Sequence, residues 1–260
     1  MNDQKEGGLG SPEAKIVESK DIDLDNPLLI CGFPSSGLIG TIAANEIIEQ
    51  FDMERVAHLR SKYIPSAAVF FEGRLRHPFR IYASEKKNLL VAISEVPVDE
   101  PGMYQVSSCL LDWAKEKGAR ETVVLDGIPV RGMPSERKVL YASEMEKQKE
   151  LEGVGDLEML KKGIITGIAG SILSETLTRD MVGFTLLTPA MAMVPDPKGA
   201  AELLKAVDKL YGFGVSIEKL EESAEEVRNK MKEMAQQVEN MRQQRGGQQQ
   251  QDEDFQRLYG

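Results

Sequence analysis

The segment from Gly32 to Gly40 has the clearest potential for binding chemistry in this sequence. Its residues, GFPSSGLIG, follow an apolar run that starts at Pro27 and precede a helical pattern. Glycines between a strand and a helix leave backbone N–H groups free for a phosphate, which the helix dipole also attracts. The segment departs from the Walker loop, which needs Lys and Ser or Thr where Leu38 and Ile39 stand, and Pro34 replaces a glycine of the dinucleotide pattern. A tight turn that allows close packing of the strand and the helix is the alternative, and we favour it.

Other polar residues lack the partners that catalysis requires. Ser35 and Ser36 are outside a G-x-S-x-G motif and have no evident histidine partner. Asp126 follows an apolar run and is interpreted as a turn aspartate, and Asp196 is interpreted as the cap of a helix. We therefore predict no catalytic residue, no metal site and no cofactor. The alternative function is an enzyme that acts on a nucleoside or another phosphorylated ligand at the Gly32–Gly40 turn.

The cysteines and histidines also favour structural roles. Cys31 lies in the apolar run LLICGF and Cys109 in the predicted helix 104–117, so both are predicted to be buried thiols. Two cysteines without matching histidine spacing do not make a zinc site. His58 and His77 are in separate polar contexts, AHLR and RLRHPF, and are interpreted as surface or hydrogen-bonded residues.

Composition excludes several classes of partner. The chain has 260 residues, 41% of them hydrophobic, and a formal net charge of −10. An acidic balance disfavours non-specific binding to nucleic acid and to anionic membranes, which both require clustered Lys and Arg. No apolar run approaches the roughly 20 residues that span a bilayer, and the start, MNDQKEGGLGSPEAK, has no apolar core of a signal peptide. We predict a cytoplasmic protein with a disordered leader at residues 1–21.

Strand and helix patterns alternate from residue 22 to residue 213, which predicts a three-layer α/β/α body with a mostly parallel sheet. Apolar runs without alternation are typical of strands buried on both faces. The predicted strands are 27–32, 57–62, 67–72, 79–84, 89–96, 121–126, 138–143 and 183–187. The predicted helices are 38–51, 104–117 and 198–211. A glycine-bearing turn that leads into a further helix is predicted over 163–178, and a short helix is predicted near Leu157.

A different helix is predicted over residues 214–244. Its apolar positions alternate in steps of three and four, which is a heptad pattern sustained for more than three heptads. Such a narrow seam favours pairing with another helix, and hence self-association, over a helix that lies across its own domain. The seam residues are Ile217, Leu220, Ala224, Val227, Met231, Met234, Val238 and Met241.

The last segment, 245–260, is predicted to be a flexible tail. It is rich in Gly, Gln and charged residues and buries too little apolar surface to offset chain entropy. It ends with Leu258, Tyr259 and Gly260, which supply an apolar side chain, an aromatic ring and a carboxylate. This ending suits docking in a pocket of another protein.

Several motifs in a fixed order give the body a family resemblance. The chain resembles the archaeal branch of the proteasome assembly chaperone family, the relatives of the eukaryotic second assembly chaperone, over about residues 25–222. The motifs that carry the resemblance are PLLICGFP from Pro27, GLIG from Gly37, PGMY from Pro101, TGIAG from Thr166 and PDPKGAA from Pro195.

The resemblance implies an α/β/α body like that of nucleoside phosphorylases, without their active-site groups. It also implies homo-oligomers and a C-terminal hydrophobic-tyrosine-any motif that enters pockets between α-subunits of the 20S proteasome. Leu258 would then be the apolar anchor, Tyr259 the ring that orders the gate, and the Gly260 carboxylate the partner of a pocket lysine. The implied function is that of an ATP-independent assembly chaperone or activator. A passive oligomeric scaffold is a further alternative.

Overall fold

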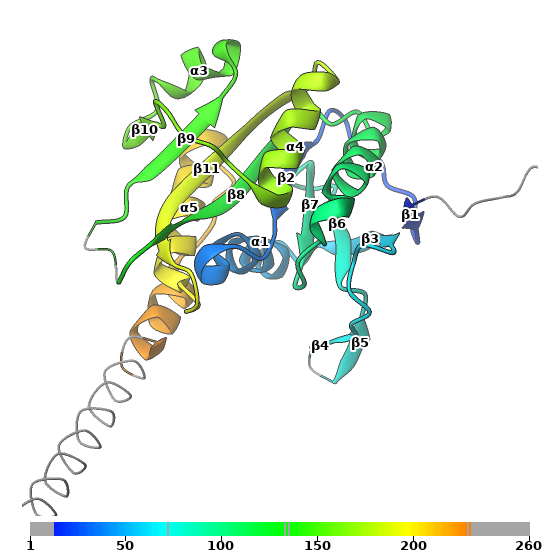
Figure 1. The fold of residues 1–260 in the computed structure, drawn as a ribbon, viewed down its shortest axis with the longest axis horizontal. Helices are drawn as coiled ribbons and strands as arrows, with labels where there is room; N and C mark the ends of the chain where they lie inside the picture. Colours follow the sequence, from blue (N-terminus) through cyan, green and yellow to red (C-terminus); the bar gives the residue numbers. More distant parts are fainter. Residues whose placement is uncertain (1–12, 72, 133, 135, 228, 230–260) are drawn as a thin grey trace, which may run out of the picture. The chain divides into compact units, whose positions relative to one another are not determined.

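The computed structural model describes residues 13–71, 73–132, 134, 136–227 and 229 (Figure 1). The chain divides into two compact units, Met1–Ile217 and Glu218–Gly260. Within the described ranges, no helix is both long and apolar enough to cross a membrane.

A nine-stranded sheet forms the centre of the first unit. Its four middle strands, β7, β2, β8 and β11, are parallel to one another, which confirms the prediction of a mostly parallel central sheet. The flanking pairs β1–β3, β3–β6, β6–β7 and β11–β9 are antiparallel, and β10 is parallel to β9. In spatial order the strands are β1 (Ala14–Glu18), β3 (Glu54–Ser61), β6 (Phe79–Ser84), β7 (Leu89–Ser94), β2 (Leu28–Gly32), β8 (Glu121–Val130), β11 (Val182–Met191), β9 (Val139–Ser143) and β10 (Leu157–Met159).

Helices cover both faces of this sheet. On one face α1 (Ile39–Gln50) packs against α5 (Pro197–Tyr211), and on the other α2 (Met103–Glu116) packs against α4 (Gly167–Thr178) (Figure 1). Leu29 and Cys31 of β2 belong to the core beneath α2 and α4, so their neighbours along the strand face α1. All five residues of β2 are buried. This explains why the strand is a continuous apolar run and does not alternate between apolar and polar residues.

Six predicted elements agree with the structure to within one residue at each end, and two of them are the strands 27–32 and 138–143, which correspond to β2 and β9. The predicted helices 38–51, 104–117 and 198–211 correspond to α1, α2 and α5 with bounds that differ by one residue at most, and the predicted strand 79–84 is β6. A small separate hairpin, β4 (Val69–Phe71) and β5 (Arg74–Arg76), follows β3.

Other expectations are corrected. Ala14–Glu18, inside the expected leader, forms the edge strand β1. Leu157 begins strand β10 instead of a short helix, and the helix in this region is α3 (Met145–Leu151). The strand that was expected to end at Asp126 continues to Val130. β2 ends opposite Leu125, so the rest of β8 pairs with β11 alone, and one edge is free to accommodate Pro129, which has no N–H.

The second unit is described only at its beginning. Residues 218–227 are helical and include the predicted seam residues Leu220, Ala224 and Val227, whereas Ile217 precedes the helix. Met231, Met234, Val238 and Met241 lie outside the described residues, as do Leu258, Tyr259 and Gly260. The heptad helix therefore stays a prediction.

Two glycines determine how closely α1 approaches the sheet. A Cβ atom added to Gly32 would lie 2.2 Å from the Gly40 carbonyl oxygen, and one added to Gly40 would lie 2.2 Å from the Leu125 carbonyl oxygen. Both neighbours are backbone atoms, which cannot move aside as a flexible side chain can. The strand β2, the helix α1 and the strand β8 are thus in direct backbone contact.

We expect Gly40→Ala to lower the free energy of unfolding by about 3 kcal/mol, because the new methyl group would overlap the Leu125 carbonyl and force α1 away from the sheet. Urea denaturation measures the change. The control is Gly153→Ala, since a Cβ at Gly153 would meet no heavy atom within 4 Å. Equal stability of the two variants would show that the close contact at Gly40 does not constrain the fold.

Candidate functional site

The Gly32–Gly40 turn lies at the carboxyl ends of the parallel strands, where α/β proteins commonly bind ligands. Here the chain itself occupies that position. A Cβ added to Gly127 of β8 would lie 2.3 Å from the Ser36 carbonyl oxygen, and one added to Gly37 would lie 2.9 Å from the Cβ atoms of Ala190 and Asp196. The sides of the turn that meet the sheet have no room for one more carbon atom. The geometry therefore agrees with the close-packing interpretation of the glycines.

Two successive residues of the turn have left-handed backbone conformations. Gly37 has φ 67°, which glycine adopts without strain, and Leu38 has φ 51°. A left-handed conformation costs a residue with a Cβ atom about 1 kcal/mol. The Leu38 side chain remains 41% exposed at the surface. The strained backbone therefore presents an apolar side chain to solvent at this edge.

Asp126 lies at the same edge and is largely shielded from solvent. Burial raises the pKa of its carboxyl group, and the Ser35 hydroxyl and the Gly127 N–H oppose this rise. The Gly127 N–H donates to Asp126 Oδ1 at 2.7 Å, whereas the Ser35 hydroxyl makes no hydrogen bond of normal geometry. The raised pKa means that burial disfavours the ionised form of this carboxyl group relative to an exposed aspartate.

Both histidines of the chain are remote in sequence but stack on each other. The His58 ring on β3 and the His77 ring just before β6 have centroids 3.7 Å apart, and their planes are nearly parallel, with an angle of 2° between them. Burial lowers the pKa of both rings, and nearby arginines lower it further. Sequence reasoning placed these residues in separate contexts. It missed their stacking because the pairing of β3 with β6, which places His58 opposite Arg80, is not a local feature.

Asp196 is confirmed as the cap of α5. Its Oδ1 accepts a hydrogen bond from the Gly199 N–H at 3.0 Å, and its own N–H donates to the Gly37 carbonyl at 2.8 Å. Its other oxygen forms an ion pair with Arg137, and both side chains are less than a tenth exposed. Arg137 also donates to the Pro189 carbonyl at 3.3 Å. The buried pair thus joins the start of α5, the end of β11 and the glycine turn, and no sequence pattern indicated the role of Arg137.

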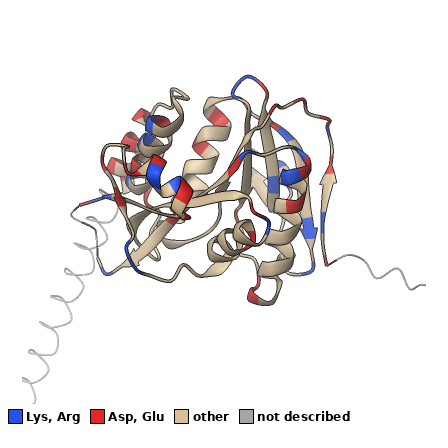
Figure 2. Ribbon diagram, turned by 90° about the horizontal axis from the view of Figure 1, so that it is seen from above, with Lys and Arg blue, Asp and Glu red and all other residues tan. Residues whose placement is uncertain are grey.

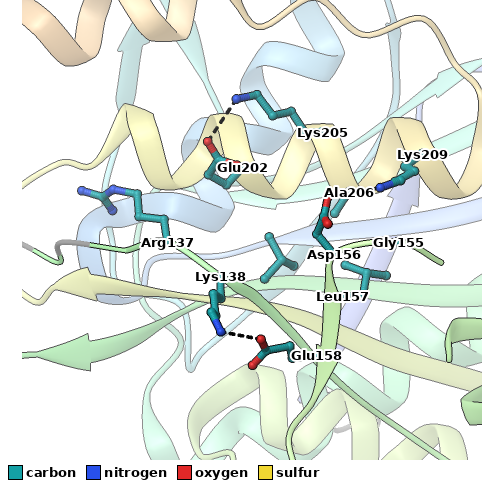
Figure 3. A pocket seen from close by; sticks show the side chains of 11 residues that line it. Arg137, Lys138, Gly155, Asp156, Leu157, Glu158, Glu202, Lys205, Ala206 and Lys209 are labelled. Carbon is teal, nitrogen blue, oxygen red and sulfur yellow. Dashed lines mark hydrogen bonds and ion pairs between the residues drawn. The ribbon is translucent and has the colours of Figure 1, made fainter. Parts of the chain in front are cut away.

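A cavity of about 600 Å³ lies beside this pair, between α5 and the strands β9 and β10 (Figure 3). Its charged side chains are of both signs and pair with one another: Lys138 with Glu158 at 2.6 Å, Lys205 with Glu202 at 3.1 Å and Lys209 with Asp156 at 3.3 Å. The fourth basic residue of the lining, Arg137, pairs with Asp196 outside it, so the charges of the lining are compensated and select neither an anion nor a cation.

The prediction of a buried thiol is confirmed for Cys31 but not for Cys109. Cys31 is buried and Cys109 is half-buried, and neither is in a disulfide. Burial raises the pKa of both thiols, which keeps them in the protonated, less reactive form at neutral pH.

Comparisons with known proteins agree on one family. The family model described as "PAC2 family" matches residues 29–235. PbaA of Pyrococcus furiosus, described as an archaeal homolog of proteasome-assembly chaperone, is 28% identical, with a TM-score of 0.79 over 91% of this chain and 97% of its own. PbaB of the same organism, described as an archaeal proteasome activator, is 26% identical, with a TM-score of 0.76 over 86% and 99%. A Thermoplasma acidophilum protein of unknown function is 35% identical, with a TM-score of 0.72 over 85% and 91%.

We expect Asp126→Asn to stabilise the protein at pH 7 and to have little effect near pH 3. Because the pKa of Asp126 is raised in the folded state, its ionisation costs stability. That cost is absent below the pKa of the unfolded chain, about 4, and grows as the pH rises to the folded value. Urea denaturation of both proteins at several pH values measures the difference. A variant that is less stable at every pH would contradict the unfavourable burial of this carboxylate.

We expect Arg137→Met to lower the free energy of unfolding by about 3–5 kcal/mol, since it leaves the Asp196 carboxylate buried without its partner. Lys138→Met is the matched control, because Lys138 and Glu158 are both more than half exposed and their pair contributes less than about 1 kcal/mol. Thermal or urea unfolding measures both variants. Equal effects would show that the buried pair is not needed for stability.

Proposed function

The chain belongs to the PAC2 family, and on this basis we propose that it is an ATP-independent proteasome assembly chaperone or activator in the cytoplasm. The observation that carries the proposal is the similarity to PbaA and PbaB over nearly the whole body, since one is described as a homolog of an assembly chaperone and the other as a proteasome activator. Its partners would be the α-subunits of the 20S proteasome and other copies of the chain.

The body supports a binding role more than an enzymatic one. The carboxyl edge of the sheet, the usual position of an α/β active site, is filled by the Gly32–Gly40 turn and by the Arg137–Asp196 pair. The hydroxyl of Ser35 has the Asp126 carboxyl group as its neighbour, and the two histidines stack on each other at β3 and β6. These placements give the alternative of a nucleoside or phosphate-ester enzyme no support.

The C-terminal residues are the proposed contact with the α-ring. Leu258 would fill an apolar part of the pocket, the Tyr259 ring would order the gate, and the Gly260 carboxylate would pair with a lysine. The residues between Gly246 and Arg257 can span about 40 Å when fully extended, which is ample reach from a body to a pocket on a neighbouring protein.

Self-association would multiply this contact. A three-residue anchor binds weakly alone, but several anchors on one oligomer raise the effective concentration of those still unbound. We propose that the seam residues of segment 214–244, from Ile217 to Met241, contribute to the oligomer together with the body.

We expect deletion of Leu258, Tyr259 and Gly260 to abolish capture of 20S α-subunits, and Tyr259→Ala to weaken it at least tenfold, because buried aromatic anchors commonly contribute 2 kcal/mol or more. Co-purification read by native mass spectrometry measures both. Gln256→Ala is the control, since it alters the tail outside the motif. Capture of α-subunits by the truncated chain at the level of the intact chain would refute docking through the tail.

A further inference from the structure

Residues 54–81 form a basic region in an otherwise acidic chain. They include six basic and two acidic residues, a formal charge of +4, whereas the whole chain has a charge of −10. The basic residues are Arg55, Arg60, Lys62, Arg74, Arg76 and Arg80, and both histidines of the chain are in the same region. In Figure 2, Lys and Arg residues (blue) recur on the outer strands at the right of the view.

Strand pairing gathers part of this charge on one face of the sheet. Ala57 and Leu59 of β3 point into the core, so His58 and Arg60 point to the opposite face. Lys15 on β1 is the cross-strand partner of Arg60. We call the exposed residues Lys15, Arg55 and Arg60, with the His58–His77 stack beside them, the basic face.

The neighbouring acidic groups already have partners of their own. Glu13 pairs with Lys62 at 2.7 Å, Glu54 pairs with Lys20 at 2.6 Å, and Glu95 pairs with the buried Arg80. Within the described ranges, no ion pair neutralises the exposed side chains of the basic face.

A cavity of about 730 Å³ opens at this face. Lys15, Arg60, Lys62 and His77 contribute to its lining, with Glu13 as its one carboxylate among the described residues. This cavity therefore differs from the one beside α5, whose charges cancel. Its excess of positive charge suits carboxylates.

The hairpin of β4 and β5 borders the same cavity, because Ala67, two residues before it, and His77, the residue directly after it, are part of the lining. Phe70 and Leu75 are cross-strand partners on this hairpin and are 69% and 66% exposed. An exposed apolar pair next to positive charge favours an acidic polypeptide over a nucleic acid, which the net charge of the chain would also repel.

The described start of the second unit has the complementary chemistry. Residues 218–226, EKLEESAEE, contain five glutamates and one lysine. Glu222 and Glu226 are exposed and four residues apart on the helix 218–227, which places their Cβ atoms about 6 Å apart. Directly paired residues on neighbouring antiparallel strands, such as Lys15 and Arg60, have Cβ atoms about 5 Å apart. The two spacings match.

We propose that the basic face binds the acidic helix 218–227 of a second copy of this chain. Glu222 and Glu226 pair with Lys15, Arg55 and Arg60 of the partner, and the hairpin covers the contact at its side. This inference rests on the self-association included in the proposed function, and it specifies the surfaces that meet.

Charge reversal tests the proposal with the full-length chain. We expect Arg55→Glu with Arg60→Glu to weaken self-association at least tenfold in sedimentation velocity, and Glu222→Arg with Glu226→Arg to do the same. The variant with all four changes should recover most of the association, because the charges are complementary again. Lys138→Glu, an exposed reversal on β9's side of the sheet, is the control, and circular dichroism verifies that each variant is folded.

Two results would overturn the proposal. One is unchanged association of the Arg55→Glu, Arg60→Glu variant, and the other is failure of the four-residue variant to recover. If duplex DNA binds the wild type but not the Arg55→Glu, Arg60→Glu variant, while self-association is unchanged, the basic face is a nucleic-acid site instead. Self-association of the chain that lacks Leu258, Tyr259 and Gly260, measured in parallel, separates this question from the tail mechanism, because that deletion leaves the basic face and the helix 218–227 unchanged.

Discussion

The close backbone contact between β2, α1 and β8 is the constraint on which the body depends. Gly32 and Gly40 leave no space for a side chain between the strand and the helix, and Gly40 in turn touches Leu125. The position of α1 fixes the glycine turn, whose Gly37 carbonyl accepts a hydrogen bond from Asp196. The start of α5 and its ion pair with Arg137 therefore take their positions from the same contact.

This constraint also explains why the Gly32–Gly40 turn, although it lies in a typical ligand-binding position, serves to pack elements of the fold together. Phosphate-binding loops keep their backbone N–H groups free at the carboxyl edge of a sheet. In this chain the corresponding turn packs on β8 and on the cap of α5. The usual active-site position of the sheet is therefore occupied by the protein's own backbone. The chain is similar over most of its length to an archaeal assembly-chaperone homolog and to an archaeal proteasome activator.

The sequence predicted those parts of the fold whose signals are local. The apolar runs of β2 and β8 and the amphipathic pattern of α2 identified a sheet covered on both faces, and Asp196 before Pro197 identified the start of α5. The edge strands β1 and β10 were missed because they are short and half exposed, so they carry little hydrophobic pattern. The Arg137–Asp196 pair and the His58–His77 stack join residues that are far apart in the chain, and no local pattern encodes such contacts.

The order of strands in the sheet has a consequence for biosynthesis. β11 is the direct neighbour of β8 and separates it from β9, yet it is made after both. Until β11 (Val182–Met191) has left the ribosome, the apolar strand β8 has one edge without a partner, and unpaired edges promote aggregation. β9 also cannot join the sheet before β11 is made, because β11 is the strand that links β9 to β8. A protein that we propose to guide the assembly of other subunits is thus itself prone to aggregation during translation. At that stage general chaperones would have a partly completed sheet to protect.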